Sequence, residues 1–282
     1  MIPAEHGCRA EILFRSIRGA RHRIRRIFPP EIREDREPVV FLHEGLGCIE
    51  IWKDVPEAVC AASGRVGLVY DRRGYGESAD YPTPVWPKDY LITETGYLPP
   101  LLDACGVERA ALVGHSDGAS LALLAAAIAP DRVVGVVSEA AHIFVEEITA
   151  AGIREAVGAY KAADLREKLA RFLGPRTDAV FWRWADTWLS PEFRDWNIEA
   201  FLPQITAPLL VIQGVDDPYG TPAQVAGIAA GVSGPVKKVL LPECGHIPHF
   251  QARQATLSLV REFLEKPGDQ SGREVTASAS RG

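Results

Sequence analysis

Short apolar runs of strand length alternate with helical patterns along most of this chain, and this alternation limits the possible folds more than any other feature. The runs lie at residues 38–45, 65–70, 108–115 and 133–141, and the same rhythm returns at 207–214 and 236–250. Runs in which almost every position is apolar are typical of strands buried on both faces of a parallel sheet. The sequence therefore predicts an α/β fold, with a mostly parallel sheet flanked by helices.

Residues 142–203 interrupt this rhythm. They contain no buried-strand run, carry many charges at helical spacing, and hold four of the six tryptophans, Trp182, Trp184, Trp188 and Trp196. We therefore expect a core made of residues 1–141 and 204–266, with residues 142–203 inserted as a helical lid over one end of the sheet. The small and polar residues of 267–282 predict a disordered tail.

Charge and hydropathy narrow the classes of partner. The 282 residues carry 31 basic and 37 acidic side chains, and the formal net charge of −6 argues against a nucleic-acid partner. Seven arginines lie between residues 9 and 26, where the alternation in 21–28 favours a strand with a solvated basic face over a polyanion-binding or membrane-binding patch. No apolar run reaches the roughly 20 residues that cross a bilayer, so we expect no membrane partner.

The cysteines indicate the compartment. Five of them are widely spaced with no CxxC pair, namely Cys8, Cys48, Cys60, Cys105 and Cys244. This pattern is typical of reduced thiols, so we expect a cytoplasmic protein without disulfides. No glycine-rich phosphate loop or dinucleotide fingerprint occurs, and we predict neither a cofactor nor a metal. The sequence leaves the oligomeric state open.

The stretch LVGHSDGASL, residues 112–121, carries the strongest chemical signal. It places Ser116 between Gly114 and Gly118, where a buried run gives way to a helical pattern. Two residues without a Cβ allow the strand and the helix to approach closely, and the serine between them is exposed on a sharp turn. This G-x-S-x-G arrangement predicts that Ser116 is a nucleophile.

A serine nucleophile needs a base and an acid that orients the base. Asp216 and Asp217 follow the run at 207–214, and His246 and His249 follow the next run. The order serine, aspartate, histidine is that of α/β-hydrolases and differs from the other common serine triads. Glu139, near the end of the run at 133–141, is a weaker alternative acid.

On these residues the chain, from about 10 to 266, resembles the α/β-hydrolase superfamily, in particular lid-containing, esterase-like members with a serine nucleophile. In that family the acid often stands three residues after the glycine of a G-x-x-D turn, which implies Asp217, with Asp216 as a turn residue. The family pattern GHxPH resembles residues 245–249 and implies His246 as the base, with His249 in a supporting role.

Stabilising an oxyanion requires two backbone N–H groups. One comes from the residue after the nucleophile, Asp117, whose side chain we expect to turn away from the pocket. The resemblance places the other donor in the loop His43–Gly47, at Gly45 or Leu46, and we favour Gly45. Glu44 stands where the family usually has glycine, and its role stays open.

The sequence thus predicts a serine hydrolase that acts on a small-molecule ester or related acyl substrate through Ser116, Asp217 and His246. A thioesterase, a lactonase or a carbon–carbon bond hydrolase would use the same chemistry, and the last would be supported by a carboxylate-binding arginine such as Arg183 or Arg194. In this fold epoxide hydrolases and haloalkane dehalogenases use an aspartate nucleophile, which Ser116 disfavours. A non-catalytic receptor of the same fold is the alternative of another class.

Overall fold

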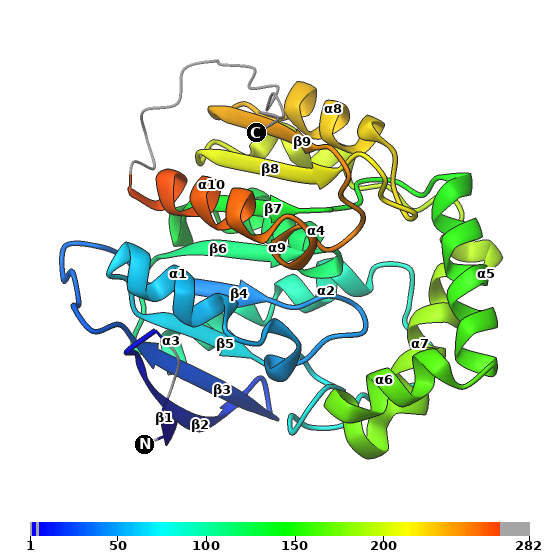
Figure 1. Ribbon diagram of the computed structural model, residues 1–282, viewed down its shortest axis with the longest axis horizontal. Helices are drawn as coiled ribbons and strands as arrows, with labels where there is room; N and C mark the ends of the chain where they lie inside the picture. Colours follow the sequence, from blue (N-terminus) through cyan, green and yellow to red (C-terminus); the bar gives the residue numbers. More distant parts are fainter. Residues whose placement is uncertain (1, 4–5, 266–282) are drawn as a thin grey trace, which may run out of the picture.

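The computed structural model describes residues 2–3 and 6–265, and a single mixed sheet runs through them (Figure 1). The sheet has nine strands in the order β1-β2-β3-β5-β4-β6-β7-β8-β9. Neighbours from β5 to β9 are parallel, and β1, β2 and β3 join them antiparallel at one edge. The strands span Ile2–Pro3, Arg9–Ile17, Ala20–Phe28, Val39–Leu42, Gly67–Tyr70, Ala110–His115, Val133–Glu139, Leu209–Gly214 and Val236–Leu241. The predicted α/β-hydrolase fold is confirmed.

The central strands are buried on both faces, as their apolar runs predict. Every residue of β4, β5, β6 and β8 is buried. On β4, Val40 and Leu42 belong to one hydrophobic cluster, whereas Val39 and Phe41 belong to a second cluster. Because successive side chains of a strand point to opposite faces, these clusters are the two layers of core between sheet and helices.

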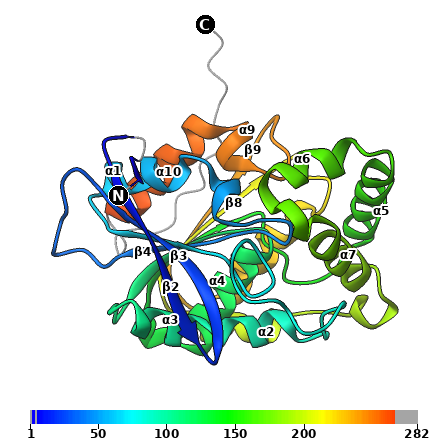
Figure 2. The ribbon, with the colours of Figure 1, turned by 90° about the horizontal axis from the view of Figure 1, so that it is seen from below.

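Helices cover both faces of the sheet (Figure 2). Helices α1 (Val55–Ser63) and α10 (Arg253–Glu265) contact each other and supply residues such as Val59 and Phe263 to one cluster. The other face is covered by α2 (Tyr90–Thr95), α3 (Leu98–Ala104), α4 (Asp117–Ile128) and α8 (Pro222–Gly231). Helix α4 is buried along nearly its whole length, because it packs on β4, β6 and β7. This packing places the start of α4 against the middle strands of the sheet.

Three helices follow β7 and lie beyond the carboxyl ends of the strands (Figure 1). They are α5 (Glu147–Lys161), α6 (Asp164–Leu173) and α7 (Thr177–Trp188), followed by 3-10 turns η4 (Pro191–Phe193) and η5 (Glu199–Gln204). An antiparallel bridge between Phe144 and Asn197 brings the two ends of this insertion together. The helical character predicted for 142–203 agrees with these elements, and the role of a lid stays a prediction.

The strand predicted for residues 21–28 is β3, and Arg21 on it is exposed, but the expectation of a solvated basic face is wrong at Arg23. Arg23 is buried on β3, where its guanidinium contacts the carboxylates of Asp71, Glu50 and Glu77 at 2.6–2.7 Å. Alternation along a strand does not reveal that one face is covered by the neighbouring loop. The predicted tail, 267–282, lies outside the described residues. Within the described part of the chain, no helix has the length and apolarity to cross a membrane.

Candidate active site

Ser116 stands on a strained turn between β6 and α4. Its backbone has φ 54° and ψ −120°, a conformation that residues with a side chain rarely adopt. A Cβ on Gly114 would lie 2.2 Å from the carbonyl oxygen of Gly118, and a Cβ on Gly118 would lie 1.9 Å from that of Leu42. Both glycines are therefore required by backbone contacts, and the turn they permit holds Ser116 at the carboxyl edge of the sheet.

The structure brings Ser116, His246 and Asp217 into one hydrogen-bonded chain. The Ser116 hydroxyl lies 2.9 Å from Nε2 of His246. On the other side of the same ring, both carboxylate oxygens of Asp217 lie 2.9 Å from Nδ1 of His246. Asp217 follows β8 and His246 follows β9, so parallel strands deliver both side chains to the same edge. Burial acts to raise the pKa of Asp217, but the hydrogen bond and charge of His246, together with the N–H of Tyr219 and the charge of His142, outweigh it and lower that pKa. An ionised Asp217 keeps the proton of His246 on Nδ1, which leaves Nε2 free to accept the proton of Ser116.

The other candidate acids and bases lie elsewhere. Asp216 is exposed, as expected of a turn residue. Glu139 contacts Nδ1 of His249 at 2.7 Å, and both side chains are buried. His249 therefore belongs to a separate carboxylate–imidazole pair, in keeping with a supporting role.

The residues predicted to form the oxyanion hole, Gly45, Leu46 and Asp117, line the same cavity as Ser116. The carbonyl oxygen of Glu44 accepts hydrogen bonds from His43 Nδ1 at 2.7 Å, Arg72 Nη2 at 2.9 Å and the Gly47 N–H at 3.1 Å. Three donors on one carbonyl hold the loop before Gly45 in a defined conformation. Whether Gly45 or Leu46 supplies the second N–H stays open.

The Asp117 carboxylate is directed at buried partners. It accepts a hydrogen bond of 2.8 Å from the Tyr90 hydroxyl and lies 3.6 Å from Nη2 of Arg72. The Tyr90 hydroxyl in turn accepts a hydrogen bond from the indole N–H of Trp188, which lies on α7. These contacts explain how a carboxylate can stand next to the nucleophile, since buried partners hold it. They also connect the start of α4 to the helical insertion.

A cavity of about 280 Å³ opens above Ser116. Its lining is mostly apolar, and it includes Trp184 and Trp188 from α7 together with Phe172 from α6. The insertion therefore forms much of the wall of the cavity. Polar lining comes from side chains that the sequence did not single out, namely His142, Thr149, Lys168 and Tyr219.

Neither predicted carboxylate-binding arginine lines this cavity. Arg183 donates to the Thr83 carbonyl oxygen at 3.1 Å and lies over the rings of Tyr81 and Trp86. Arg194 lines a separate cavity of about 410 Å³. A helical pattern identifies the helix but not the direction of each side chain, so the sequence alone could not place them.

Comparison with known proteins decides the family. A family model described as "Alpha/beta hydrolase family" matches residues 39–259, which is most of the chain. The chain belongs to the alpha/beta hydrolase family.

Individual relatives differ in their named activities. This alpha/beta hydrolase family member is 39% identical to epoxide hydrolase B of Mycobacterium tuberculosis over 100 residues, 35% of this chain and 27% of that protein. It therefore matches less than a third of that relative's length. It is 27% identical to the human serine hydrolase BPHL over 207 residues, covering 70% of this chain and 69% of BPHL.

Solved structures share the fold. The enol-lactonase of Burkholderia xenovorans LB400 superposes with a TM-score of 0.70 at 21% identity, covering 90% of this chain and all of that chain. Identity this low shows a common fold alone.

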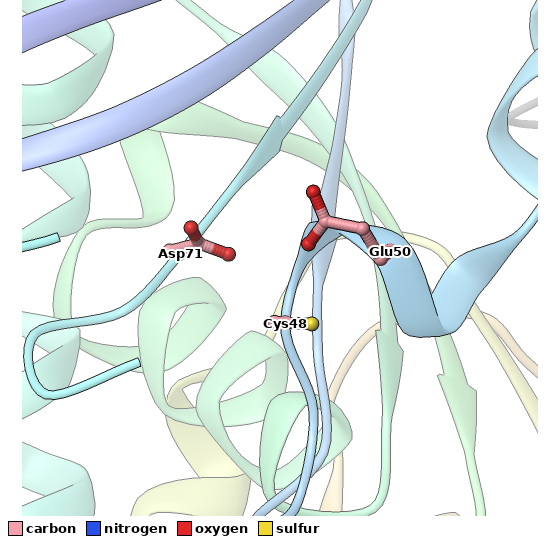
Figure 3. Close-up of side chains that lie close together, drawn as sticks. All are labelled: Cys48, Glu50 and Asp71. Atoms are coloured by element: carbon pink, nitrogen blue, oxygen red, sulfur yellow. The ribbon is translucent and has the colours of Figure 1, made fainter. Parts of the chain in front are cut away.

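One group of side chains in this alpha/beta hydrolase fold has the composition of a metal site. Cys48, Glu50 and Asp71 lie close together, from the loop before η1 (Ile49–Trp52), from η1 itself and from the end of β5 (Figure 3). However, Nε of Arg23 donates to Asp71 at 2.6 Å and its Nη2 donates to Glu50 at 2.7 Å. The guanidinium already supplies the positive charge, so we interpret the group as an ion-pair cluster that joins β3 to these loops.

Glu94 on α2 is a buried carboxyl group that makes stability depend on pH. Burial raises the pKa of Glu94 from 4.5 to about 7, although Arg72 and Arg73 act in the opposite direction. The folded state thus binds the proton more tightly than the unfolded state. Its contribution to stability is complete below about pH 4.5 and is lost as the pH rises through about 7.

Glu94→Gln is therefore expected to gain stability relative to wild type as the pH rises from 4.5 to 8, by roughly 3 kcal/mol for this shift in pKa. Urea unfolding of both proteins at several pH values measures the difference. A difference that stays constant across this range would contradict the assignment.

Proposed function

We propose that the protein is a serine hydrolase that cleaves a small ester or a related acyl compound through a covalent acyl-enzyme. The observation that supports this most directly is the hydrogen-bonded chain from Ser116 through His246 to Asp217, with 2.9 Å at each link. A hydroxyl, an imidazole and an ionised carboxylate in this order can generate a serine nucleophile near neutral pH.

In the proposed reaction, Oγ of Ser116 attacks the acyl carbon while its proton passes to Nε2 of His246. The carbonyl oxygen becomes an oxyanion, which the N–H of Asp117 and that of Gly45 or Leu46 stabilise. His246 then donates the proton to the leaving alkoxide, and the alcohol departs. Water enters, loses a proton to His246 and attacks the acyl carbon of the acyl-enzyme. The bond between that carbon and Oγ of Ser116 then breaks, Oγ takes the proton back from His246, and the carboxylic acid is released.

The cavity limits the acyl group. A volume of about 280 Å³ with a mostly apolar lining favours a compact, uncharged group beside Ser116. Ser116, and not a carboxylate, faces Nε2 of His246 at the nucleophile position, which disfavours the activity named for epoxide hydrolase B. The positions of Arg183 and Arg194 also remove the feature that would favour carbon–carbon bond hydrolysis. Thioesters and lactones stay within the proposed chemistry.

Two measurements test the proposal on the wild-type protein. p-Nitrophenyl esters of increasing acyl length should be hydrolysed, with the rate falling once the acyl group exceeds the cavity. A fluorophosphonate should form a covalent adduct, and peptide mass spectrometry should locate it on Ser116. Absence of both turnover and adduct would overturn the proposal and favour a receptor that binds its ligand without chemistry.

A further inference from the structure

A second carboxylate–imidazole pair lies beside the proposed catalytic residues. Oε2 of Glu44 lies 2.5 Å from Nδ1 of His115, and Nε2 of His115 lies 2.7 Å from the backbone carbonyl oxygen of His246. His115 is buried, with 2% of its side chain exposed, and Glu44 lines the cavity above Ser116. The pair thus has direct contacts with the proposed site without facing the Ser116 hydroxyl.

The two acceptors fix the proton positions on His115. A carbonyl oxygen only accepts hydrogen bonds, so Nε2 of His115 must carry a proton. Its Nδ1 faces the carboxylate of Glu44, which, when ionised, accepts a hydrogen bond from a second ring proton held on Nδ1. Burial acts to lower the pKa of His115, but Glu44, followed by Glu139 and the His246 carbonyl, together outweigh burial and raise that pKa to about 9. Burial acts to raise the pKa of Glu44, but His115 outweighs it and lowers that pKa to about 2. Near neutral pH the pair is therefore an imidazolium with a carboxylate.

This arrangement repeats that of Asp217 and His246. In both, a carboxylate orients an imidazole through Nδ1, and Nε2 contacts an oxygen: the Ser116 hydroxyl in one case and the His246 carbonyl in the other. The second pair also joins three segments of the chain: the loop after β4, the end of β6 and the loop after β9. Glu44 precedes the oxyanion residue Gly45, His115 precedes Ser116, and the acceptor belongs to His246 itself.

We propose that Glu44 and His115 are positioning residues, which hold the backbone of His246 so that its Nε2 stays aligned with Ser116. The inference rests on the proposed serine hydrolase activity and deepens it. The sequence left the role of Glu44 open, and its contact with His115 assigns it this positioning role. Misplacing a catalytic group by about 1 Å can cost roughly 10²-fold in rate, so the effect of the pair should be visible in kcat.

Charged and titratable groups face the pair from several elements. His115 is surrounded by Glu44, by Glu139 of β7, by the ring of His246 at 5.2 Å and by that of His249 at 4.9 Å. Glu139 already contacts His249 at 2.7 Å, so Glu44 is the carboxylate that directly controls the proton on Nδ1 of His115. When His115 loses that proton, a lone pair faces the carboxylate and the alignment is lost.

The test compares wild type with Glu44→Ala, Glu44→Gln and Glu243→Gln, using p-nitrophenyl esters from pH 6 to 10 and subtracting the rate with Ser116→Ala. Glu44→Ala should lower kcat by roughly 10²-fold and leave KM within about threefold, because alignment and not substrate binding is lost. Glu44→Gln should recover at least about tenfold of this loss, since its amide can donate to Nδ1 of a neutral His115. Glu243, exposed in the loop that carries His246, is the matched control, and its substitution should leave kcat unchanged.

The pH profile separates positioning from a general loss of structure. Wild type should lose activity above about pH 9 as His115 deprotonates, whereas Glu44→Gln should lack this alkaline step because its His115 is already neutral. This readout decides the matter even if Glu44→Ala fails to fold, which circular dichroism would reveal. If wild type is active and both Glu44→Gln and Glu44→Ala have the same kcat and the same alkaline loss of activity as wild type, the inference is overturned but the proposed function is not. A wild type with neither turnover nor fluorophosphonate adduct overturns the proposed function as well.

Discussion

Replacing Ser116 by alanine is expected to lower the rate of ester hydrolysis by at least about 10⁴-fold, because the bond to the acyl carbon can no longer form. The residual rate would come from the oxyanion donors and from substrate binding alone. His246→Ala should cause a loss of the same order, since Ser116 then has no acceptor for its proton at 2.9 Å. Stopped-flow or steady-state assays with p-nitrophenyl esters measure both effects.

Asp217→Asn should cost less than His246→Ala but still about 10³- to 10⁴-fold, because an amide no longer keeps the proton of His246 on Nδ1. Its neighbour provides a matched control. Asp216→Asn removes an exposed carboxylate one residue away, and its activity should equal that of wild type. Equal losses in Asp216→Asn and Asp217→Asn would show that the charge of the loop, and not the contact with His246, sustains the reaction.

Gly118→Ala is expected to lower the free energy of unfolding by at least about 3 kcal/mol, although alanine is the better helix former. The new Cβ would lie 1.9 Å from the carbonyl oxygen of Leu42 and 2.7 Å from that of His43. Backbone atoms of a central strand cannot move aside as a flexible side chain can. Helix α4 would have to shift away from β4, which would also displace Ser116.

Gly158→Ala provides the matched control for that substitution. Gly158 also lies within a helix, α5, but its Cβ would meet no atom within 4 Å. The change should therefore raise the free energy of unfolding by about 0.5–1 kcal/mol, the usual gain when alanine replaces glycine in a helix. Urea unfolding monitored by circular dichroism measures both variants. Similar free energies for the two would contradict a steric requirement at Gly118.

Local sequence rules account for much of the fold and for the arrangement of the site. Continuous apolar runs specify strands that are buried on both faces, and β4, β5, β6 and β8 have this burial. Gly114 and Gly118 flank Ser116 because only glycine fits both close approaches. Asp217 and His246 each follow a parallel strand. The carboxyl ends of such strands meet at one edge, so their order along the chain indicated their proximity.

Other features depend on contacts between residues far apart in the chain. Arg23 is buried although its strand looks amphipathic, because the loops that carry Glu50, Asp71 and Glu77 cover that face with carboxylates. Arg183 and Arg194 have the right chemistry for a ligand carboxylate, but the rotation of α7 and the path of the chain after it direct them elsewhere.

By itself the sequence determined the α/β architecture and the sharp turn at Ser116, because periodicity and the steric freedom of glycine are local properties. It also placed candidate acids and bases after the later strands, and the resemblance to α/β-hydrolases then implied Asp217 and His246 among them. Only the tertiary structure decided that Glu44 reaches His115, and that His115 reaches the carbonyl of His246. Each of these contacts joins the end of β6 to a separate loop at the edge of the sheet. The direction of a side chain across such a gap is set by packing, which no local pattern specifies.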